Sequence, residues 1–88
     1  MMTSAQMRAA RALLGIDQRQ LADLSGVSLP TIRRMEASDG NVRGIVDSLT
    51  KVIEALNTAG VDLIGEEAPS LEGGRGVRLR RPVRRDDA

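Results

Sequence analysis

The side chains best equipped for chemistry in this sequence are its arginines. The 88 residues include twelve arginines and one lysine, Lys51, but no His, Cys, Trp, Tyr or Phe. A guanidinium group is permanently charged and donates paired hydrogen bonds, so it recognises phosphates and base edges rather than making or breaking bonds. The composition therefore favours recognition of an anionic or hydrogen-bond-accepting partner.

The residues on which most enzymes depend are missing from the sequence. Without His, the commonest general base and metal ligand is absent, and without Cys there is no thiolate nucleophile or usual zinc site. No GxxxxGK[ST] sequence surrounds Lys51, and the spacing of Glu66, Glu67 and Glu72 does not fit an EF-hand. We therefore expect a protein that is not an enzyme and needs no metal or cofactor.

The most informative segment, residues 18–36, contains Arg33 and Arg34 near its end. Gly26 divides it into two short helices, a pattern typical of a helix-turn-helix. Ala22 is small where the two helices must cross closely. Three apolar residues are spaced to hold the second helix against the first: Val27, Ile32 and Met35. The outer face of the second helix is then free to enter a major groove.

Capping signals predict the helices that position this segment. The expected N-caps are Thr3, Asp17, Ser28 and Asn41, and the expected glycine stops are Gly15, Gly26 and Gly60. Gly44 weakens the first turn of the fourth helix, which places its regular part nearer Ile45. The expected inward-facing residues are Met7, Ala10, Leu14, Leu21, Ala22, Leu24, Ile45, Leu49, Val52, Ile53 and Leu56.

The hydrophobic period changes after residue 60. Alternation in segments 61–64 and 76–80 predicts two antiparallel strands. A lone hairpin is marginal in water, so this ribbon must pack on the helices or on another chain. We expect a mainly α fold of four to five helices with a small ribbon. The helix-turn-helix domain occupies residues 1–60, a ribbon suited to dimerisation occupies 61–80, and a disordered Arg-rich tail occupies 81–88.

Charge is distributed unevenly in the last third of the chain. Residues 61–72 hold four acids and no base, whereas residues 73–85 hold six arginines and no acid. The Arg-rich stretch 75–85 can contact DNA, pair with the acidic segment of its own or a partner chain, or act as a solubilising tail. Alternation favours a strand for 76–80, so residues 81–85 are the better candidates for DNA contact.

Residues 5–60 resemble the Xre/Cro/C1 family, the phage-repressor type of DNA-binding regulator. The match is best over residues 16–36, where Ala22, Gly26 and the terminal Met35-Glu36 fall in register. The ending resembles that of a subgroup of short regulators common in alphaproteobacteria. The resemblance implies that the third helix lies in the major groove of duplex DNA.

The resemblance assigns base reading first to Leu29, Pro30 and Arg34. Arg34 suits guanine, whose O6 and N7 accept a guanidinium fork worth about 1–3 kcal/mol of discrimination. Leu29 and Pro30 can only contact thymine methyl groups, so readout also depends on Thr31 and Arg33.

The resemblance further assigns phosphate contacts to four residues on two elements: Gln18, Arg19, Asn41 and Arg43. The first two lie at the start of the second helix and the last two at the expected start of the fourth. It also implies that Arg11 and Glu36 form a partly buried structural ion pair.

These features predict a cytoplasmic, nucleoid-associated transcriptional regulator. No apolar run reaches 18 residues, and Arg8 and Arg11 interrupt the stretch where a signal peptide would lie. One recognition helix covers few base pairs, so we expect a homodimer on a pseudo-palindromic operator with half-sites ~34 Å apart. We expect a repressor, because 88 residues leave no room for an effector or activation domain.

Two other functions stay open at this point. The first is an antitoxin of a toxin–antitoxin pair, in which the same fold binds DNA and the C-terminal segment binds the toxin. The second is a protein–protein adaptor whose helix-turn-helix does not bind DNA, an interpretation that Leu29 and Pro30 favour.

Overall fold

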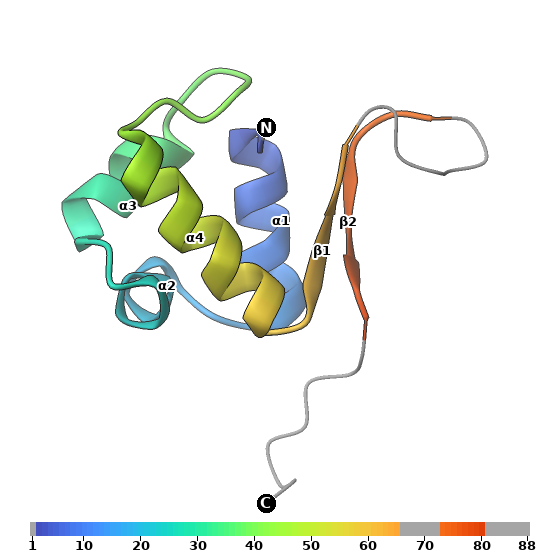
Figure 1. The fold of residues 1–88 in the computed structure, drawn as a ribbon, viewed down its shortest axis with the longest axis horizontal. Helices are drawn as coiled ribbons and strands as arrows, with labels where there is room; N and C mark the ends of the chain where they lie inside the picture. The colour runs from blue at the N-terminus through green and yellow to red at the C-terminus, as the bar shows by residue number, and fades with distance from the viewer. Residues whose placement is uncertain (1, 66–72, 81–88) are drawn as a thin grey trace, which may run out of the picture.

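The computed structural model describes residues 2–65 and 73–80, which form four helices and two strands (Figure 1). The helices are α1 (Ser4–Leu14), α2 (Gln18–Ser25), α3 (Leu29–Glu36) and α4 (Val46–Thr58), and the strands are β1 (Val61–Ile64) and β2 (Gly76–Leu79). The predicted mainly α fold with a two-stranded antiparallel ribbon is confirmed. The predicted disorder of residues 81–88 and the acidic residues at 66–72 lie outside the described residues.

The first three helices begin at the caps that the sequence predicts. Thr3 Oγ1 accepts a hydrogen bond from the Gln6 backbone N–H at 3.0 Å, and Gln6 Oε1 accepts one from the Thr3 N–H at 2.9 Å. Asp17 and Gln20 form the same reciprocal box at α2, and Ser28 caps α3. Two left-handed glycines end α1 and α2, with φ of 68° and 73°: Gly15 and Gly26.

The fourth helix begins next to Ile45, as the sequence predicts from Gly44, but the predicted cap at Asn41 is wrong. Asn41 does not cap α4, which begins at Val46 with Ile45 as an N-cap that makes no side-chain hydrogen bond. The preceding residues are extended because they pair with the N-terminal segment, where the Val42 N–H donates to the Met2 carbonyl at 2.9 Å. Ile45 is therefore 74% exposed and does not belong to the core.

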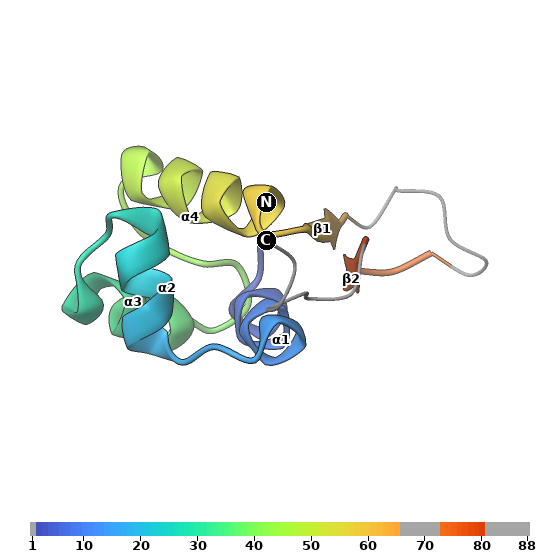
Figure 2. The ribbon, with the colours of Figure 1, turned by 90° about the horizontal axis from the view of Figure 1, so that it is seen from below.

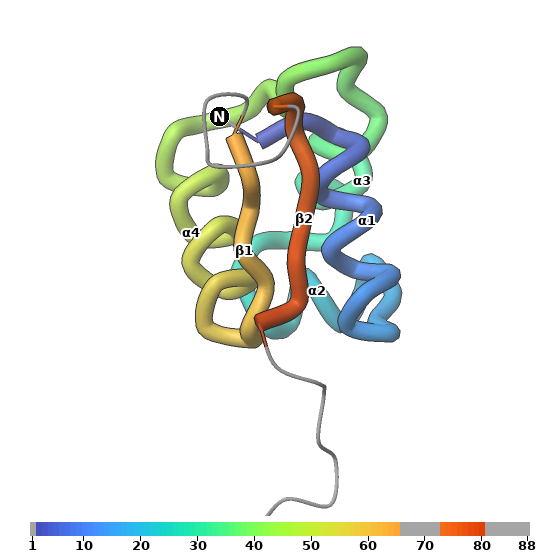
Figure 3. The backbone as a smooth tube through the Cα atoms, turned by 90° about the vertical axis from the view of Figure 1, so that its right-hand side faces the viewer, coloured from blue at the N-terminus to red at the C-terminus, as the bar shows by residue number. Residues whose placement is uncertain are grey.

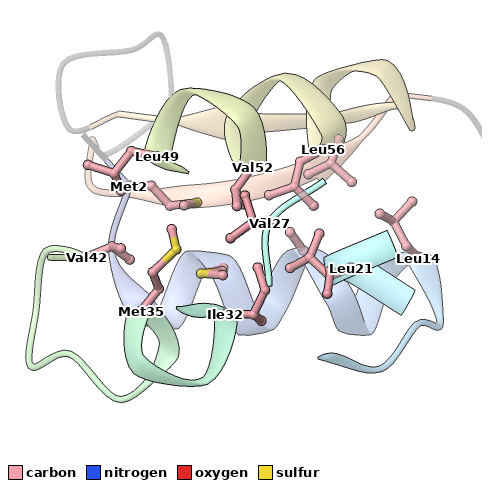
Figure 4. Close-up of a cluster of buried hydrophobic side chains, with 14 residues drawn as sticks. Met2, Leu14, Leu21, Val27, Ile32, Met35, Val42, Leu49, Val52 and Leu56 are labelled. Atoms are coloured by element: carbon pink, nitrogen blue, oxygen red, sulfur yellow. The ribbon is translucent and has the colours of Figure 1, made fainter. Parts of the chain in front are cut away.

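The helices enclose an aliphatic core, which Figure 4 shows between α4 and the other helices. Its largest fully buried side chains are Met7, Leu21, Ile32, Met35, Leu56, Val52 and Val61. Leu24, predicted to face inward, is 57% exposed. The inner face of α2 is centred between Leu21 and Ala22, and Leu24 lies about 110° around the helix from that centre.

The ribbon packs on α1 and α4 at the end of the molecule opposite α3 (Figures 1 and 2). Figure 3 shows β1 beside α4 and β2 beside α1. Val61 pairs with Leu79 and Leu63 with Val77, so these four apolar side chains share the face that packs on the helices. The ribbon is thus part of the same folded unit as the helices.

Gln6 fastens the ribbon to α1. Its Nε2 donates to the carbonyl oxygens of Ile64 and Gly76, each at 2.9 Å, so one amide binds both strands. The side chain is buried, and its Oε1 accepts a hydrogen bond from the Thr3 N–H.

No helix among the described residues has the length and apolar character needed to cross a membrane.

Candidate nucleic-acid interface

α3 turns one face toward the core and the other toward solvent. Ile32 and Met35 are buried, whereas Pro30, Arg33 and Arg34 are exposed. The helix lies at the edge of the molecule, away from the ribbon (Figures 1 and 2). A short helix that projects a cationic face in this way has the shape that a major groove admits.

Arg34 is held along α3 by its neighbour one turn earlier. Its Nη2 donates to Thr31 Oγ1 at 3.3 Å, and the same oxygen accepts a hydrogen bond from Ser28 Oγ at 2.9 Å. A guanidinium carries five N–H groups, so this single bond leaves donors for a paired contact with a base edge. Thr31 therefore orients Arg34 without consuming its capacity to bind.

A shallow hollow joins α3 to the start of α2. It is lined by Asp17, Gln18, Arg19, Leu29 and Arg33. Within residues 2–65 and 73–80, the side chains of Arg19 and Arg33 form no ion pair or hydrogen bond. Four of the predicted contact residues therefore lie together in this hollow: Gln18, Arg19, Leu29 and Arg33. Arg33, predicted to read bases, lies beside Gln18 and Arg19, which are predicted to contact phosphates.

Asn41 and Arg43 lie in the loop between α3 and α4 rather than at the start of α4. Both are exposed. The Arg43 N–H donates to Ser38 Oγ at 3.1 Å, and a Cβ placed on Gly44 would lie 3.7 Å from Met35 Cγ. The loop is therefore packed against the C-terminal end of α3, so predicted phosphate contacts lie near both ends of this helix.

Beneath this surface, one buried carboxylate joins three helices. Glu36 Oε2 lies 2.6 Å from Arg11 Nε, Oε1 lies 2.7 Å from Arg11 Nη2, and Gln18 Nε2 donates to Oε1 at 3.2 Å. The hydrogen bond with Glu36 raises the pKa of Arg11 above its ordinary value. The pairing that the family resemblance implies is present, and it also fixes the start of α2 against α3.

Arg8, which is not among the predicted site residues, also contacts the end of α3. Its Nη1 donates to the backbone carbonyl of Glu36 at 2.7 Å, satisfying a carbonyl at the end of α3. Its position three residues before Arg11 is the signal that could have identified it, because residues at this spacing share a helix face. Two arginines of α1 thus hold the end of α3.

Residues 2–65 and 73–80 contain no group of three or more His, Cys, Asp or Glu that could hold a metal ion. No curated protein matches the chain closely enough to count as a relative. The helix-turn-helix family matches residues 7–63, which run from α1 into β1 and make up more than half of the chain. The chain therefore belongs to the Xre/Cro/C1-like helix-turn-helix family of DNA-binding regulators.

Proposed function

We propose that this protein is a sequence-specific regulator that inserts α3 into the major groove of duplex DNA. The observation that carries the proposal is the exposed face of α3, on which neither Arg33 nor Arg34 forms an ion pair with a described residue. Phosphate rows flank the major groove and attract a cationic helix face. The buried side chains of Ile32 and Met35 keep this face turned outward.

Arg34 is the main base-reading residue in this proposal. Its contact with Thr31 holds the guanidinium in place before DNA binds, which lowers the entropy lost on binding. Pro30 is exposed and Leu29 is half-buried, so both can offer only apolar contact to thymine methyl groups. Sequence preference then centres on one guanine for each copy of α3.

Phosphate contacts flank α3 on both sides. Gln18 uses one amide N–H within the protein and has a second for a phosphate oxygen. Arg19 and Arg33 share its hollow, and we infer that both contact the same phosphate row. At the other end of α3, Asn41 and Arg43 are exposed, and in this proposal they contact the opposite row.

A homodimer on a pseudo-palindromic operator completes the proposal. α3 has only eight residues, so one copy covers few base pairs, and a second copy supplies the remaining specificity. Half-sites then lie ~34 Å apart, one turn of DNA. A dimer occupying a promoter represses transcription by excluding polymerase, as we propose for a cytoplasmic, nucleoid-associated protein.

The direct test is selection of bound fragments from genomic DNA, followed by sequencing. The proposal predicts enrichment of a pseudo-palindrome with half-sites one turn apart, overlapping promoters. A protein that binds no fragment even at low salt, where phosphate contacts are strongest, contradicts DNA reading and favours the adaptor function.

A second candidate function, an antitoxin, is favoured by a groove of about 460 Å³ between α4 and β1. Its wall includes the apolar Ile53, Leu63 and Ile64 together with Glu54. The groove is lined by residues of α4 and the ribbon, and Figure 2 shows the ribbon at the opposite end of the molecule from α3, so a toxin could bind there without covering α3. Expressing the product of a neighbouring gene with and without this protein tests the idea, and a neighbour that never inhibits growth contradicts it.

A further inference from the structure

Asp39 and Gly40 form an Asp-Gly pair in the loop between α3 and α4. Asp39 is the only aspartate of the sequence that precedes a glycine. Both residues are exposed, and a Cβ placed on Gly40 would meet no atom within 4 Å. Figure 1 shows this loop beside the start of α1. The Asp39 carboxylate therefore adjoins a backbone nitrogen that no side chain shields.

The two groups that can react at this pair have no partner in the part of the chain that the structure describes. Neither the Asp39 carboxylate nor the Gly40 N–H forms a hydrogen bond or ion pair with residues 2–65 or 73–80. The other described aspartates lie in a helix, in a strand or at a helix cap: Asp17, Asp23, Asp47 and Asp62. A regular backbone must break its own hydrogen bonds before a carboxyl carbon can reach the next nitrogen.

The reaction open to such a pair is isomerisation through a cyclic imide. The Gly40 nitrogen attacks the Asp39 carboxyl carbon Cγ, a C–N bond forms, and the carboxyl OH leaves with the amide proton as water. Water then opens the imide ring at either carbonyl. Opening at the side-chain carbonyl restores aspartate, whereas opening at the backbone carbonyl leaves the main chain running through Cβ and Cγ. The main chain of this isoaspartate is longer by one methylene group, and no oxidant, metal or cofactor is consumed.

The added methylene group falls within a loop that two hydrogen bonds hold. The Arg43 N–H donates to Ser38 Oγ at 3.1 Å, across the Asp-Gly pair. The Ser4 N–H donates to the Gly40 carbonyl at 2.9 Å, which fixes the loop to the N-terminal segment. A longer main chain between Ser38 and Gly40 changes the geometry of both contacts. It therefore shifts Asn41 and Arg43, which follow Gly40.

We propose that Asp39 is a site of spontaneous isomerisation to isoaspartate in the folded protein, and that the isoaspartyl form binds DNA more weakly because Arg43 is displaced. The second part rests on the proposed function, in which Asn41 and Arg43 contact phosphates at the end of α3. The charge of the site does not change, since one carboxylate remains. Newly made and aged protein therefore differ in DNA affinity through the position of the backbone alone.

The first test is tryptic peptide mapping of the full chain after prolonged incubation in buffer. Cleavage after Arg34 and Arg43 releases residues 35–43, in which Asp39 is the only aspartate. A second form of this peptide should accumulate, gain mass in heavy-oxygen water, and be esterified by isoaspartyl methyltransferase with S-adenosylmethionine. Its rate of formation in the folded chain should lie within about threefold of that in the free peptide, because opening a loop costs little free energy. A slower rate in the folded chain overturns the proposal.

Asp47 is the internal control for protection by the fold. Its tryptic peptide, residues 44–51, also holds one aspartate, but in the folded chain Asp47 lies in the first turn of α4. Its isomerisation should be slower than in the free peptide by more than about threefold, because the helix must open first. The same ratio of folded to peptide rates at both aspartates overturns the claim that the fold leaves Asp39 open to reaction.

Asp39→Glu is the control variant. It keeps the charge, but its longer side chain closes an imide ring poorly, so its peptide 35–43 should yield no second form. A second form that still accumulates in this variant overturns the assignment to Asp39.

The DNA affinity of aged protein tests the second part of the proposal. Fluorescence anisotropy of the aged wild type should show a fraction that binds about tenfold more weakly, equal to the isoaspartate fraction, because phosphate contacts are lost. Asp39→Glu, incubated in the same way, should keep its affinity. Isomerisation without a change in affinity overturns the displacement of Arg43. Fresh protein that binds no DNA would contradict the proposed function and leave the modification site, which is measured without DNA, supported.

Discussion

Arg11 and Glu36 form a two-pronged ion pair that ties the last turn of α3 to α1. Arg11 Nε lies 2.6 Å from Glu36 Oε2, and Arg11 Nη2 lies 2.7 Å from Oε1. Gln18 donates to the same carboxylate, so this buried group also helps to fix the start of α2 against α3. In the proposed complex the pair does not face the major groove of DNA, but it holds α3, whose exposed side chains do.

Removing this carboxylate should destabilise the fold strongly. Glu36→Ala leaves the largely buried Arg11 guanidinium without its partner, and we expect the free energy of unfolding to fall by about 3 kcal/mol. Asp47→Ala removes an exposed ion pair with Lys51 and should change it by less than ~0.5 kcal/mol. Urea unfolding measures both, and equal effects would contradict the structural role of Glu36.

Supplying the missing cap of α4 should stabilise the protein. Ile45→Asp places a carboxylate at an N-cap that has no side-chain hydrogen bond, and we expect a gain of about 1 kcal/mol in the monomer. Ile45→Ala adds no cap and serves as the control, with little expected change. Thermal unfolding at concentrations low enough to keep the chain monomeric measures the effect. A lower melting temperature for Ile45→Asp would contradict the cap assignment.

Gln6 and Gln20 offer a matched pair of capping glutamines. Gln6 also binds both strands of the ribbon, whereas Gln20 is exposed and serves α2 alone. We expect Gln6→Ala to cost ~1–3 kcal/mol more than Gln20→Ala, because it also leaves two carbonyls without that donor. Hydrogen exchange in β1 and β2 should accelerate for the Gln6 variant only. Equal acceleration in both variants would show that Gln6 does not hold the ribbon.

The outer face of the ribbon should be sensitive to acid. The hydrogen bond from Arg80, and to a smaller extent the one from Arg78, lowers the pKa of Asp62 below its ordinary value of 3.8. A lowered folded-state pKa favours the ionised form, so this stabilisation is complete above about pH 4 and is lost as the pH falls through the lowered pKa.

Hydrogen exchange of the β1 and β2 amides measures this dependence on pH. The exchange rates are first corrected for the pH dependence of intrinsic amide exchange. In the wild type, protection of these amides should decrease in acid. In Asp62→Asn, the part of this decrease that comes from protonation of Asp62 should be absent. Protection in the wild type that increases toward acid would contradict the assigned role of the carboxylate.

Features encoded by neighbouring residues could be predicted from the sequence. Thr3, Asp17 and Ser28 cap their helices through residues three positions away, so each signal is local. The ribbon was predicted from alternation, and its strands pair in antiparallel register as expected. The family resemblance supplied the pairing of Arg11 with Glu36, which spacing alone does not give.

Features that depend on distant pairing could not be predicted. The loop before α4 is extended because Val42 bonds to Met2, forty residues earlier, and this contact removed Asn41 from its expected capping role. The hydrogen bond from Gln6 to the Ile64 carbonyl likewise joins residues 58 positions apart. The grouping of Arg33 with Gln18 likewise depends on how α2 packs against α3, which the sequence pattern does not reveal.

In the proposed complex, α3 reads DNA through Arg34 while Arg43 binds a phosphate. Fluorescence anisotropy tests it directly, with the selected operator and a copy in which the contacted guanine is replaced. Arg34→Ala should bind both duplexes equally, losing the ~1–3 kcal/mol of discrimination. Arg43→Ala should weaken binding to both alike and reduce the salt slope by about 0.9. An Arg34→Ala variant that keeps the wild-type preference for the guanine would contradict the claim.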